Sequence, residues 1–284
     1  MSDEKLLNIA LNSAKKAGVE VMKYYRDQSF TAELKEDESP VTSADIAAND
    51  ILMDQLQTLT PDIPIISEEV GTVPLAQREN WERYWLLDPI DGTGEFIIGS
   101  GDFAVNIALI ENGWPSIGVI HAPDHHLTYY AQNHLGAFKD CHLNANDQQN
   151  KSQSSHQIHV AQYQEQRRIK VAISRRQQLG LMGQYLNNDF DFDHVALGSC
   201  SLKNCLIAEG GADCYLRIGV TGEWDTGASQ CILEQAGGTI IDSEFNPLTY
   251  NKRESLLNPD FLSLGNQNIP WQKVIKAHRK VYSD

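Results

Sequence analysis

Two long apolar segments joined by Asn112-Gly113 place the strongest constraint on how this chain can fold. Asn-Gly favours the positive φ angles of a two-residue hairpin turn, so residues 103–110 and 114–121 are predicted to pair as antiparallel strands. A third strand is predicted at Leu127–Ala131. The N-terminal half is therefore expected to contain an antiparallel sheet and, with the helices that precede it, to be α+β.

Two helices are predicted before this sheet. From Asp3 to about Arg26, apolar residues recur every three or four positions, which is typical of an amphipathic helix. The pattern breaks near Pro40, and Thr42-Ser43-Ala44-Asp45 begins a second run in helical register. Asp45 thus falls in a first helical turn, where its simplest role is to complete a capping box with Thr42.

The second half of the chain alternates between strand and helix patterns. Residues from about Cys141 to His159 are rich in Asn, Gln, Ser and His, so we expect a boundary there between an α+β domain (1–150) and an α/β domain (151–284). The alternation predicts α/β structure. The predicted elements are strands at Ile169–Ser174, Asp213–Leu216 and Thr239–Asp242, and helices at Ser201–Glu209 and Trp224–Gln235.

The balance of charge excludes one class of partner. Against 38 Asp and Glu there are 23 Lys and Arg, which gives a formal net charge of −15. This sign is wrong for a protein whose main affinity comes from neutralising nucleic-acid phosphates or anionic lipid. An anionic small substrate would need local help, such as metal ions.

The cysteines and the N-terminus indicate the compartment. Five cysteines, with no C-x-x-C pair, are typical of buried thiols in a reducing compartment. The chain begins Met-Ser-Asp-Glu-Lys, without the regions of a signal peptide, and it has no apolar segment long enough to be a transmembrane span. We expect a cytoplasmic protein, and contact with the inner face of the membrane stays open.

The most informative segment is Trp85–Thr93, in which a predicted buried strand, Tyr84–Leu87, ends in Asp88-Pro89-Ile90-Asp91-Gly92-Thr93. Two carboxylates beside a Gly-Thr turn with free amides suit a metal-bound phosphate, because Mg²⁺ prefers oxygen ligands and free amides bind phosphate oxygens. On spacing alone, Asp88 and Asp91 could equally form an Asx-turn and a helix cap.

Further acids follow other predicted elements. Glu68-Glu69 follow a short strand within residues 62–67, and Asp225 begins a helix. Each has an ordinary alternative: a solvated acidic loop for the glutamates, and an interaction with the helix dipole for Asp225.

Several motifs, taken together and in order, resemble the inositol monophosphatase superfamily of lithium-sensitive, magnesium-dependent phosphatases. The resemblance extends from about Val41 to Gly238. The motifs are Ser67-Glu68-Glu69, Asp88-Pro89-Ile90-Asp91-Gly92-Thr93 with Phe96, and Glu223-Trp224-Asp225-Thr226 followed by Gly237-Gly238. Residues 94–96, 103–110 and 198–203 are most similar to the CysQ branch, the 3′(2′),5′-bisphosphate nucleotidases.

The resemblance implies a fold and a metal site. The fold would be a layered αβαβα sandwich of the inositol monophosphatase/fructose-1,6-bisphosphatase type, with an antiparallel sheet in the N-terminal half and a mixed sheet in the C-terminal half. Two or three Mg²⁺ ions would be bound by the following groups, with Asp88 shared between two ions: Glu68, Asp88, the Ile90 carbonyl, Asp91 and Asp225.

The resemblance also assigns roles around the metals. Thr93 and Asp45 would position a metal-activated water for in-line attack on phosphorus, and the Gly92 and Thr93 amides would hold the phosphate. Asp225 would also contact the substrate. The resemblance assigns no role to Glu69.

Substrate specificity is predicted to come from the C-terminal half. Arg175, in a Ser174-Arg175 pair, and Gly198, Ser199 and Lys203 lie where the family meets the sugar or nucleoside. As alternatives, Gly198-Ser199 could form only a tight turn, and Arg175 and Lys203 could be solvated surface charges. This chain departs from CysQ sequences at three places, none of which removes a metal ligand: Gly94, Arg176-Gln177 and Gly227-Ala228-Ser229. The first two replace a Lys and a His that are common in CysQ sequences, and so bear on the second-phosphate or base contacts.

The resemblance leads to a primary hypothesis, hydrolysis of adenosine 3′,5′-bisphosphate to AMP and phosphate in sulfur assimilation. Inositol-1-phosphate or a related sugar phosphate is the alternative substrate. A non-catalytic nucleotide or phosphate sensor is the alternative of another class. Monomer and homodimer both stay open.

Overall fold

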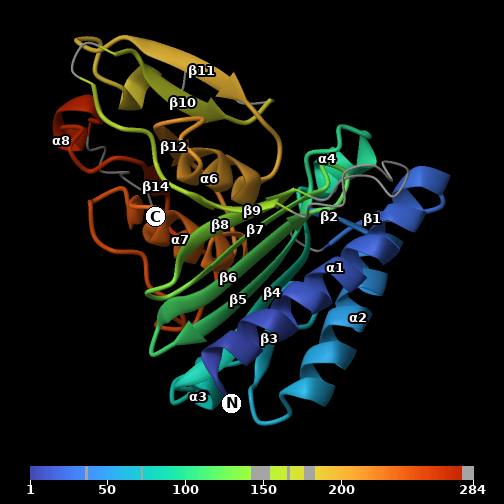
Figure 1. Cartoon of the computed structure of the whole chain (residues 1–284). Coiled ribbons are helices and arrows are strands. Elements are labelled where there is room, and N and C mark those ends of the chain that lie inside the picture. The colour runs from blue at the N-terminus through green and yellow to red at the C-terminus, as the bar shows by residue number, and fades with distance from the viewer. Residues whose placement is uncertain (36–37, 72, 142–153, 165–166, 176–182, 277–284) are drawn as a thin grey trace.

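The structure is a computed structural model that describes all residues except 36–37, 72, 142–153, 165–166, 176–182 and 277–284. Its helices and sheets stack in the order α, β, α, β, α (Figure 1). This is the layered sandwich predicted from the resemblance.

The first layer consists of α1 (Asp3–Asp27) and α2 (Ser43–Leu59), which cover one face of the larger sheet (Figure 1). Both helices were predicted. Their aliphatic faces, such as Leu6 and Leu52, pack against Trp85 and Leu87 of the sheet. This burial of apolar surface orients α2, and with it Asp45, relative to the sheet.

The larger sheet has seven strands in the order β3-β4-β5-β6-β7-β8-β9. Every neighbouring pair is antiparallel except β3 and β4, which are parallel, so the predicted hairpin and its third strand are confirmed. The strands are β3 (Ile65–Ser67), β4 (Arg83–Asp91), β5 (Ala104–Glu111), β6 (Trp114–Ala122), β7 (Leu127–Gln132), β8 (Gly136–Cys141) and β9 (Ser154–Ile158).

Strand β4 is longer than the sequence predicts, and it contains a bulge. It continues through Pro89 to Asp91, and its register with β5 shifts because Asp88 pairs with Asn106 and Asp91 with Ala104. Proline is tolerated at such an irregularity, since its missing N–H leaves no ladder bond unmade. The prediction that the strand ends at Asp88 is therefore wrong.

The bulge decides which way the two carboxylates point. In a regular strand, residues three apart lie on opposite faces, because side chains alternate with a period of two. Between the paired positions Asp88 and Asp91, β4 has two residues where β5 has one. The extra residue restores the parity, so both aspartates face the same side of the sheet.

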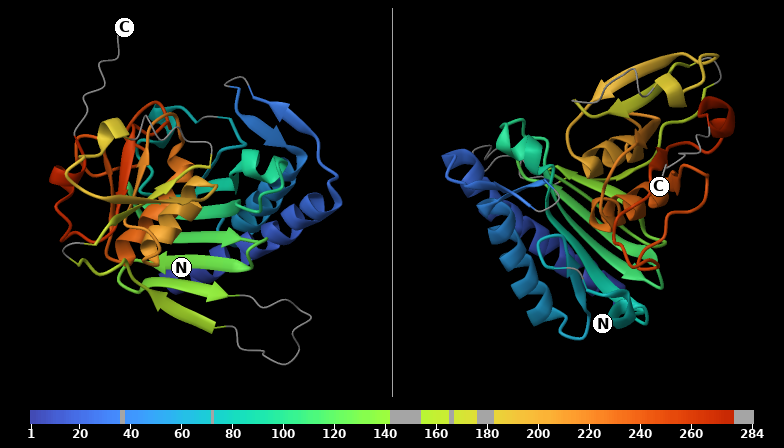
Figure 2. Two further views of the ribbon diagram at one scale, coloured as in Figure 1. Left: turned by 90° about the horizontal axis from the view of Figure 1, so that it is seen from above. Right: turned by 180° about the vertical axis from the view of Figure 1, so that it is seen from behind.

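The second half forms the other layers. Helices α6 (Cys200–Ala208) and α7 (Gly227–Gln235) lie between the two sheets (Figure 2). The smaller sheet has the order β11-β10-β12-β14-β13 and is mixed, as predicted, since β10 is parallel to both its neighbours while β14 is antiparallel to both of its own. Its strands are β10 (Ile169–Ile173), β11 (Phe192–Ala196), β12 (Cys214–Arg217), β13 (Thr239–Asp242) and β14 (Phe261–Leu264).

Short elements complete the chain. A 3₁₀ turn, η1 (Glu223–Asp225), precedes α7, so the helix predicted from Trp224 is divided in two. The last layer contains α8 (Trp271–Val274), whose Trp271 and Val274 pack on the outer face of the smaller sheet. The remaining elements are β1 (Ala32–Leu34), β2 (Pro40–Thr42), α3 (Leu75–Arg78) and α4 (Thr93–Ile97).

The two halves share one apolar core, in which Ile66 and Ala108 belong to the same cluster as Cys205 and Ile232. Strand β9, which follows residue 150, completes the larger sheet. The division at residue 150 stays a prediction, and residues 142–153 of the expected boundary lie outside the described residues.

All five cysteines have free thiols; four of them are buried, as expected, whereas Cys141 is only partly buried. In the part of the chain that the structure describes, none of the helices has the length and apolar character of a membrane span.

Candidate active site

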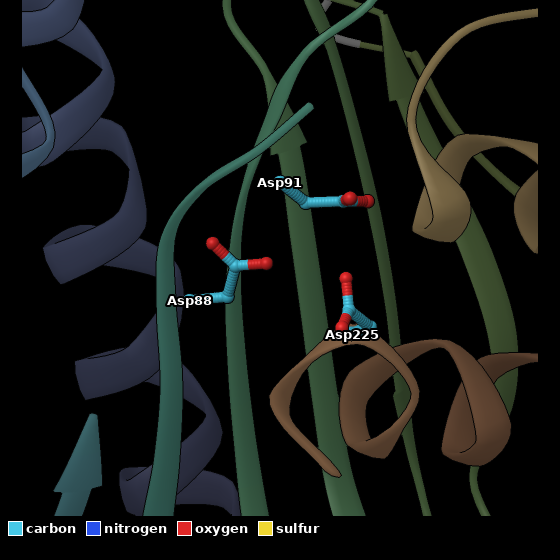
Figure 3. Close-up of side chains that lie close together, drawn as sticks. All are labelled: Asp88, Asp91 and Asp225. Atoms are coloured by element: carbon cyan, nitrogen blue, oxygen red, sulfur yellow. The ribbon is translucent and has the colours of Figure 1, made fainter. Parts of the chain in front are cut away.

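Three aspartates converge where β4 meets η1. Carboxylate oxygens of Asp88, Asp91 and Asp225 lie within 4.8 Å of one another, and Figure 3 shows the three side chains directed toward a common space. Asp88 and Asp91 come from the bulged end of β4, and Asp225 comes from the turn before α7. Such an all-oxygen donor set is the kind that hard divalent cations such as Mg²⁺ prefer.

Asp88 is the most unusual of the three. It is buried, and neither of its carboxylate oxygens has a hydrogen-bond partner among the described residues. Burial, together with the nearby charges of Glu68 and Asp91, raises the pKa of Asp88 well above its usual range. An Asx-turn at Asp88 is thus excluded, and the orphaned carboxylate fits a cation ligand.

Asp91 is held by another helix. Its carboxylate accepts the Ser199 hydroxyl at 2.5 Å and the backbone N–H groups of Cys200 and Ser201 at 3.2 and 2.6 Å, at the start of α6. Asp91 therefore does not cap α4, the helix that follows it. Since a carboxylate accepts about four hydrogen bonds or metal contacts, it keeps capacity for a cation.

Asp225 combines two roles. Its carboxylate accepts the Gly222 N–H at 2.6 Å and so caps η1. Burial of its carboxyl group and the charges of Asp91 and Glu68 raise its pKa. Capping and metal ligation are compatible, because the second oxygen lies toward Asp88 and Asp91 (Figure 3).

Glu68 and Glu69 do not form a solvated loop. The Lys35 ammonium lies 2.8 Å from a carboxylate oxygen of each, and the Glu69 side chain is only 5% exposed. Burial raises the pKa of Glu68, and Lys35 offsets part of this effect. Because β3 and β4 are parallel, Glu68 follows β3 at the sheet edge that carries Asp88.

Asp45 forms hydrogen bonds both in the N-terminal cap of α2 and in the candidate site. Its Oδ2 accepts the Thr42 hydroxyl at 2.5 Å and the Thr42 N–H at 2.8 Å, which is the predicted capping box. Its Oδ1 accepts the Thr93 hydroxyl at 3.1 Å, and that hydroxyl also lies 3.1 Å from the Ile90 carbonyl oxygen. Burial raises the pKa of the Asp45 carboxyl group, and the hydrogen bonds from Thr42 and Thr93 lower it in part. The result is a pKa of about 6.

A cleft of about 380 Å³ opens above the aspartates, large enough for a small-molecule ligand. Glu68, Asp88, Asp225 and residues 90–94 line it, together with residues of the β1–β2 connection and of the loop before η1. Gly92 has a φ of 94°, and a Cβ there would lie 2.9 Å from the Asp102 carbonyl oxygen, so glycine suits this position.

The predicted specificity residues lie behind this cleft, and none of Arg175, Gly198, Ser199 and Lys203 is among its lining residues. Arg175 and the Gly198 N–H bind Asp102, and Ser199 binds Asp91. Lys203 is buried, with its ammonium on the carbonyls of residues 197–199, so it is not a solvated charge. Their contact with substrate stays a prediction. Arg176 and Gln177 lie outside the described residues.

Sequence reasoning missed Arg217 and Lys35. Among the described residues that line the cleft, Arg217 is the only basic one. It ends β12, beside the loop that leads to Asp225, so a basic residue at that strand end was the available signal. No local sequence pattern marks Lys35 as a site residue, because the pairing of β1 with β2 determines its position.

The comparisons with known proteins agree with this geometry. Residues 2–278 match the model of the inositol monophosphatase family. The chain belongs to that family. Its members are metal-dependent phosphatases, and the acidic cluster fits that description.

Relatives and solved structures are similar over most of the chain. A 3′(2′),5′-bisphosphate nucleotidase CysQ of Aggregatibacter actinomycetemcomitans is 40% identical over 273 residues, which are 96% of this chain and 97% of the relative. The CysQ of Escherichia coli K12 is 40% identical over 90% of this chain and 98% of its own. The crystal structure of CysQ from Bacteroides thetaiotaomicron superposes with a TM-score of 0.79 and 32% identity, covering 93% and 98% of the two chains.

Proposed function

We propose that this protein is a Mg²⁺-dependent phosphatase that hydrolyses adenosine 3′,5′-bisphosphate to AMP and phosphate. The orphaned Asp88 carboxylate beside Asp91 and Asp225, at the floor of a cleft, carries the proposal, because bound cations relieve the repulsion among buried carboxylates in their ionised form. The names of the CysQ relatives support the choice of substrate.

The proposed metal ligands are Glu68, Asp88, Asp91 and Asp225, with the Ile90 carbonyl. Two or three Mg²⁺ ions would supply charge neutralisation and Lewis acidity for the attacking water and the leaving oxygen. For Glu68 to bind a cation, the Lys35 ammonium must share or release its carboxylate.

Thr93 and Asp45 would orient the attacking water through a hydrogen bond from one of its protons. The Thr93 hydroxyl has one proton, which it can give to either Asp45 or the Ile90 carbonyl. When it donates to Asp45, its lone pairs are free to accept a hydrogen bond from water and so to orient it. The capping box fixes Asp45, so this acceptor is rigid.

Two groups would hold the phosphates. The Gly92 and Thr93 amides, at the turn that follows β4, would face the scissile phosphate. Arg217, across the cleft, would bind the second phosphate, because guanidinium forms strong charge-assisted bonds with phosphate oxygens.

A comparison of substrates tests the proposal. Phosphate release would be measured from adenosine 3′,5′-bisphosphate, inositol-1-phosphate and fructose-1,6-bisphosphate, with Mg²⁺ or EDTA, for wild type and Asp91→Asn. We expect preference for the nucleotide, lost in EDTA and in the variant. Metal-dependent preference for inositol-1-phosphate would overturn the substrate but keep the reaction. Binding without turnover at saturating Mg²⁺ would identify a sensor.

A further inference from the structure

A buried carboxylate outside the cleft, Asp102, organises the wall behind the metal site. It is 1% exposed and lies in the segment between α4 and β5. Its Oδ2 accepts the Gly198 N–H at 2.8 Å and the Arg175 Nε–H at 2.9 Å, and its Oδ1 lies 3.0 Å from His125 Nε2. Burial raises its pKa, but these donors outweigh burial and lower the pKa overall, so the group is ionised.

The Gly198 bond holds a turn with an unusual conformation. Ser199 has a φ of 54°, in the left-handed region that L-residues rarely adopt, and it serves as the N-cap of α6 by accepting the Leu202 N–H. A Cβ at Gly198 would lie 2.5 Å from the Asp102 Cβ, so only glycine allows this approach. Lys203 binds the carbonyl side of the same turn. The turn is thus held from both sides by buried charges.

The Gly198-Ser199 turn also fixes the position of the Asp91 carboxylate. The Ser199 hydroxyl donates to Asp91 Oδ2, and the next two amides donate to the same carboxylate. Asp102 is therefore linked to Asp91 by two hydrogen bonds, one at the Gly198 N–H and one at the Ser199 hydroxyl, which the backbone of the turn connects. Partners that orient a ligand in this way contribute strongly to metal affinity.

We propose that Asp102 is a positioning residue for the metal site, which fixes the Gly198-Ser199 turn and through it the Asp91 carboxylate. The inference rests on the proposed function only in taking Asp91 as a metal ligand. Asp102 itself is not among the residues that line the cleft.

The test compares two buried aspartates of similar surroundings. Asp213 is also 1% exposed and also accepts one arginine and one backbone N–H, from Arg167 and Lys170, but it lies at the smaller sheet, away from the aspartate cluster. Mg²⁺ binding would be measured by calorimetry for wild type, Asp102→Asn and Asp213→Asn, with thermal unfolding in EDTA as the measure of fold. We expect the Mg²⁺ dissociation constant to rise about 10-fold or more in Asp102→Asn alone.

A double variant tests the route. If Asp102 acts through Ser199, Asp102→Asn adds little to the loss of Mg²⁺ affinity in Ser199→Ala, whereas independent effects would multiply. Equal Mg²⁺ affinities in Asp102→Asn and Asp213→Asn would overturn the inference. If Asp102→Asn does not fold, wild-type Mg²⁺ affinity in Ser199→Ala overturns it as well. A wild-type protein that binds no Mg²⁺ would instead overturn the proposed function.

Discussion

The Thr93 hydroxyl lies 3.1 Å from Oδ1 of Asp45, and this contact joins the first turn of α2 to the first residue of α4, which follows β4. The same Asp45 carboxylate caps α2 through Thr42. A helix cap and an active-site hydrogen bond thus share one side chain. The alternatives of capping and catalysis that the sequence left open for Asp45 are compatible.

This pair is expected to act on turnover more than on binding. Thr93→Ala removes the hydroxyl that would orient the water, so kcat should fall by about 10²- to 10⁴-fold with little change in KM. Steady-state kinetics with adenosine 3′,5′-bisphosphate would measure both constants. Asp50→Asn, an exposed aspartate on the same helix, is the control and should leave both unchanged. A rise in KM alone would assign Thr93 to ground-state phosphate binding.

Asp88→Asn should separate stability from activity. Replacing a buried carboxylate that has no hydrogen-bond partner removes repulsion with Asp91 and Glu68, so the metal-free variant should unfold at a higher temperature than wild type near pH 8. Its kcat should fall by orders of magnitude, since an amide is a poor Mg²⁺ ligand. Thermal unfolding in EDTA and a phosphate-release assay would measure the two effects.

The control for Asp88→Asn is Asp140→Asn on β8. Asp140 is also buried, with one oxygen that has no hydrogen-bond partner, but it lies outside the cluster and pairs with Lys15 at 3.9 Å. It should keep wild-type kcat and gain no stability. An Asp88→Asn variant with normal turnover would remove Asp88 from the metal site.

The local elements of the site could be predicted from the sequence, but their convergence could not. Periodicity and capping signals predicted α1, α2 and the hairpin, because those signals are carried by neighbouring residues. The β4 bulge depends on the register with β5, which no local pattern encodes. Without it, the spacing of Asp88 and Asp91 would direct them to opposite faces.

Two strands of the smaller sheet and the surroundings of Lys203 escaped the sequence for a related reason. Strand β14 is buried along its whole length and so has no alternation of buried and exposed residues, and β11 is an edge strand that is largely exposed. For Lys203 the sequence left a substrate-specificity role and a solvated surface charge as alternatives, and tertiary packing buries its ammonium on three carbonyls. Family resemblance, and not periodicity, drew attention to its position.

Metal-free protein should lose stability as pH rises from about 5 to about 8. The carboxyl groups of Asp88, Asp225 and Glu68 have raised pKa values, and that of Asp45 is about 6, so the folded state binds more protons than the unfolded state in this range. Stability then falls as pH increases through the folded pKa values. Mg²⁺ favours the ionised carboxylates, so its stabilising effect should grow over the same range.

Melting temperatures at each pH, in EDTA and in Mg²⁺, would check this pH dependence. Asp88→Asn, which removes one of the repelling groups, should show a flatter pH profile in EDTA. An increment from Mg²⁺ that is equal at pH 5 and pH 8 would mean that the cluster does not govern cation binding.

Arg217 should discriminate between substrates that have one phosphate and those that have two. Its guanidinium lines the cleft, bonded through Nη2 to the Val220 carbonyl and close enough to Asp225 to interact electrostatically, while its Nε has no hydrogen-bond partner. Arg217→Gln removes the charge but keeps a polar side chain. A charge-assisted bond contributes about 1.5–3 kcal/mol, so kcat/KM for adenosine 3′,5′-bisphosphate should fall by about 10- to 100-fold.

The matched substrate is 3′-AMP, which has the scissile phosphate but no second one. Its kcat/KM should be unchanged in Arg217→Gln, because Arg217 then has no phosphate to bind. Arg168→Gln, at an exposed arginine of which the side chain is 58% accessible, controls for the loss of one positive charge from an acidic protein. Equal losses on both nucleotides would show that Arg217 supports Asp225, since removing a neighbouring cation perturbs a metal ligand whichever substrate is bound.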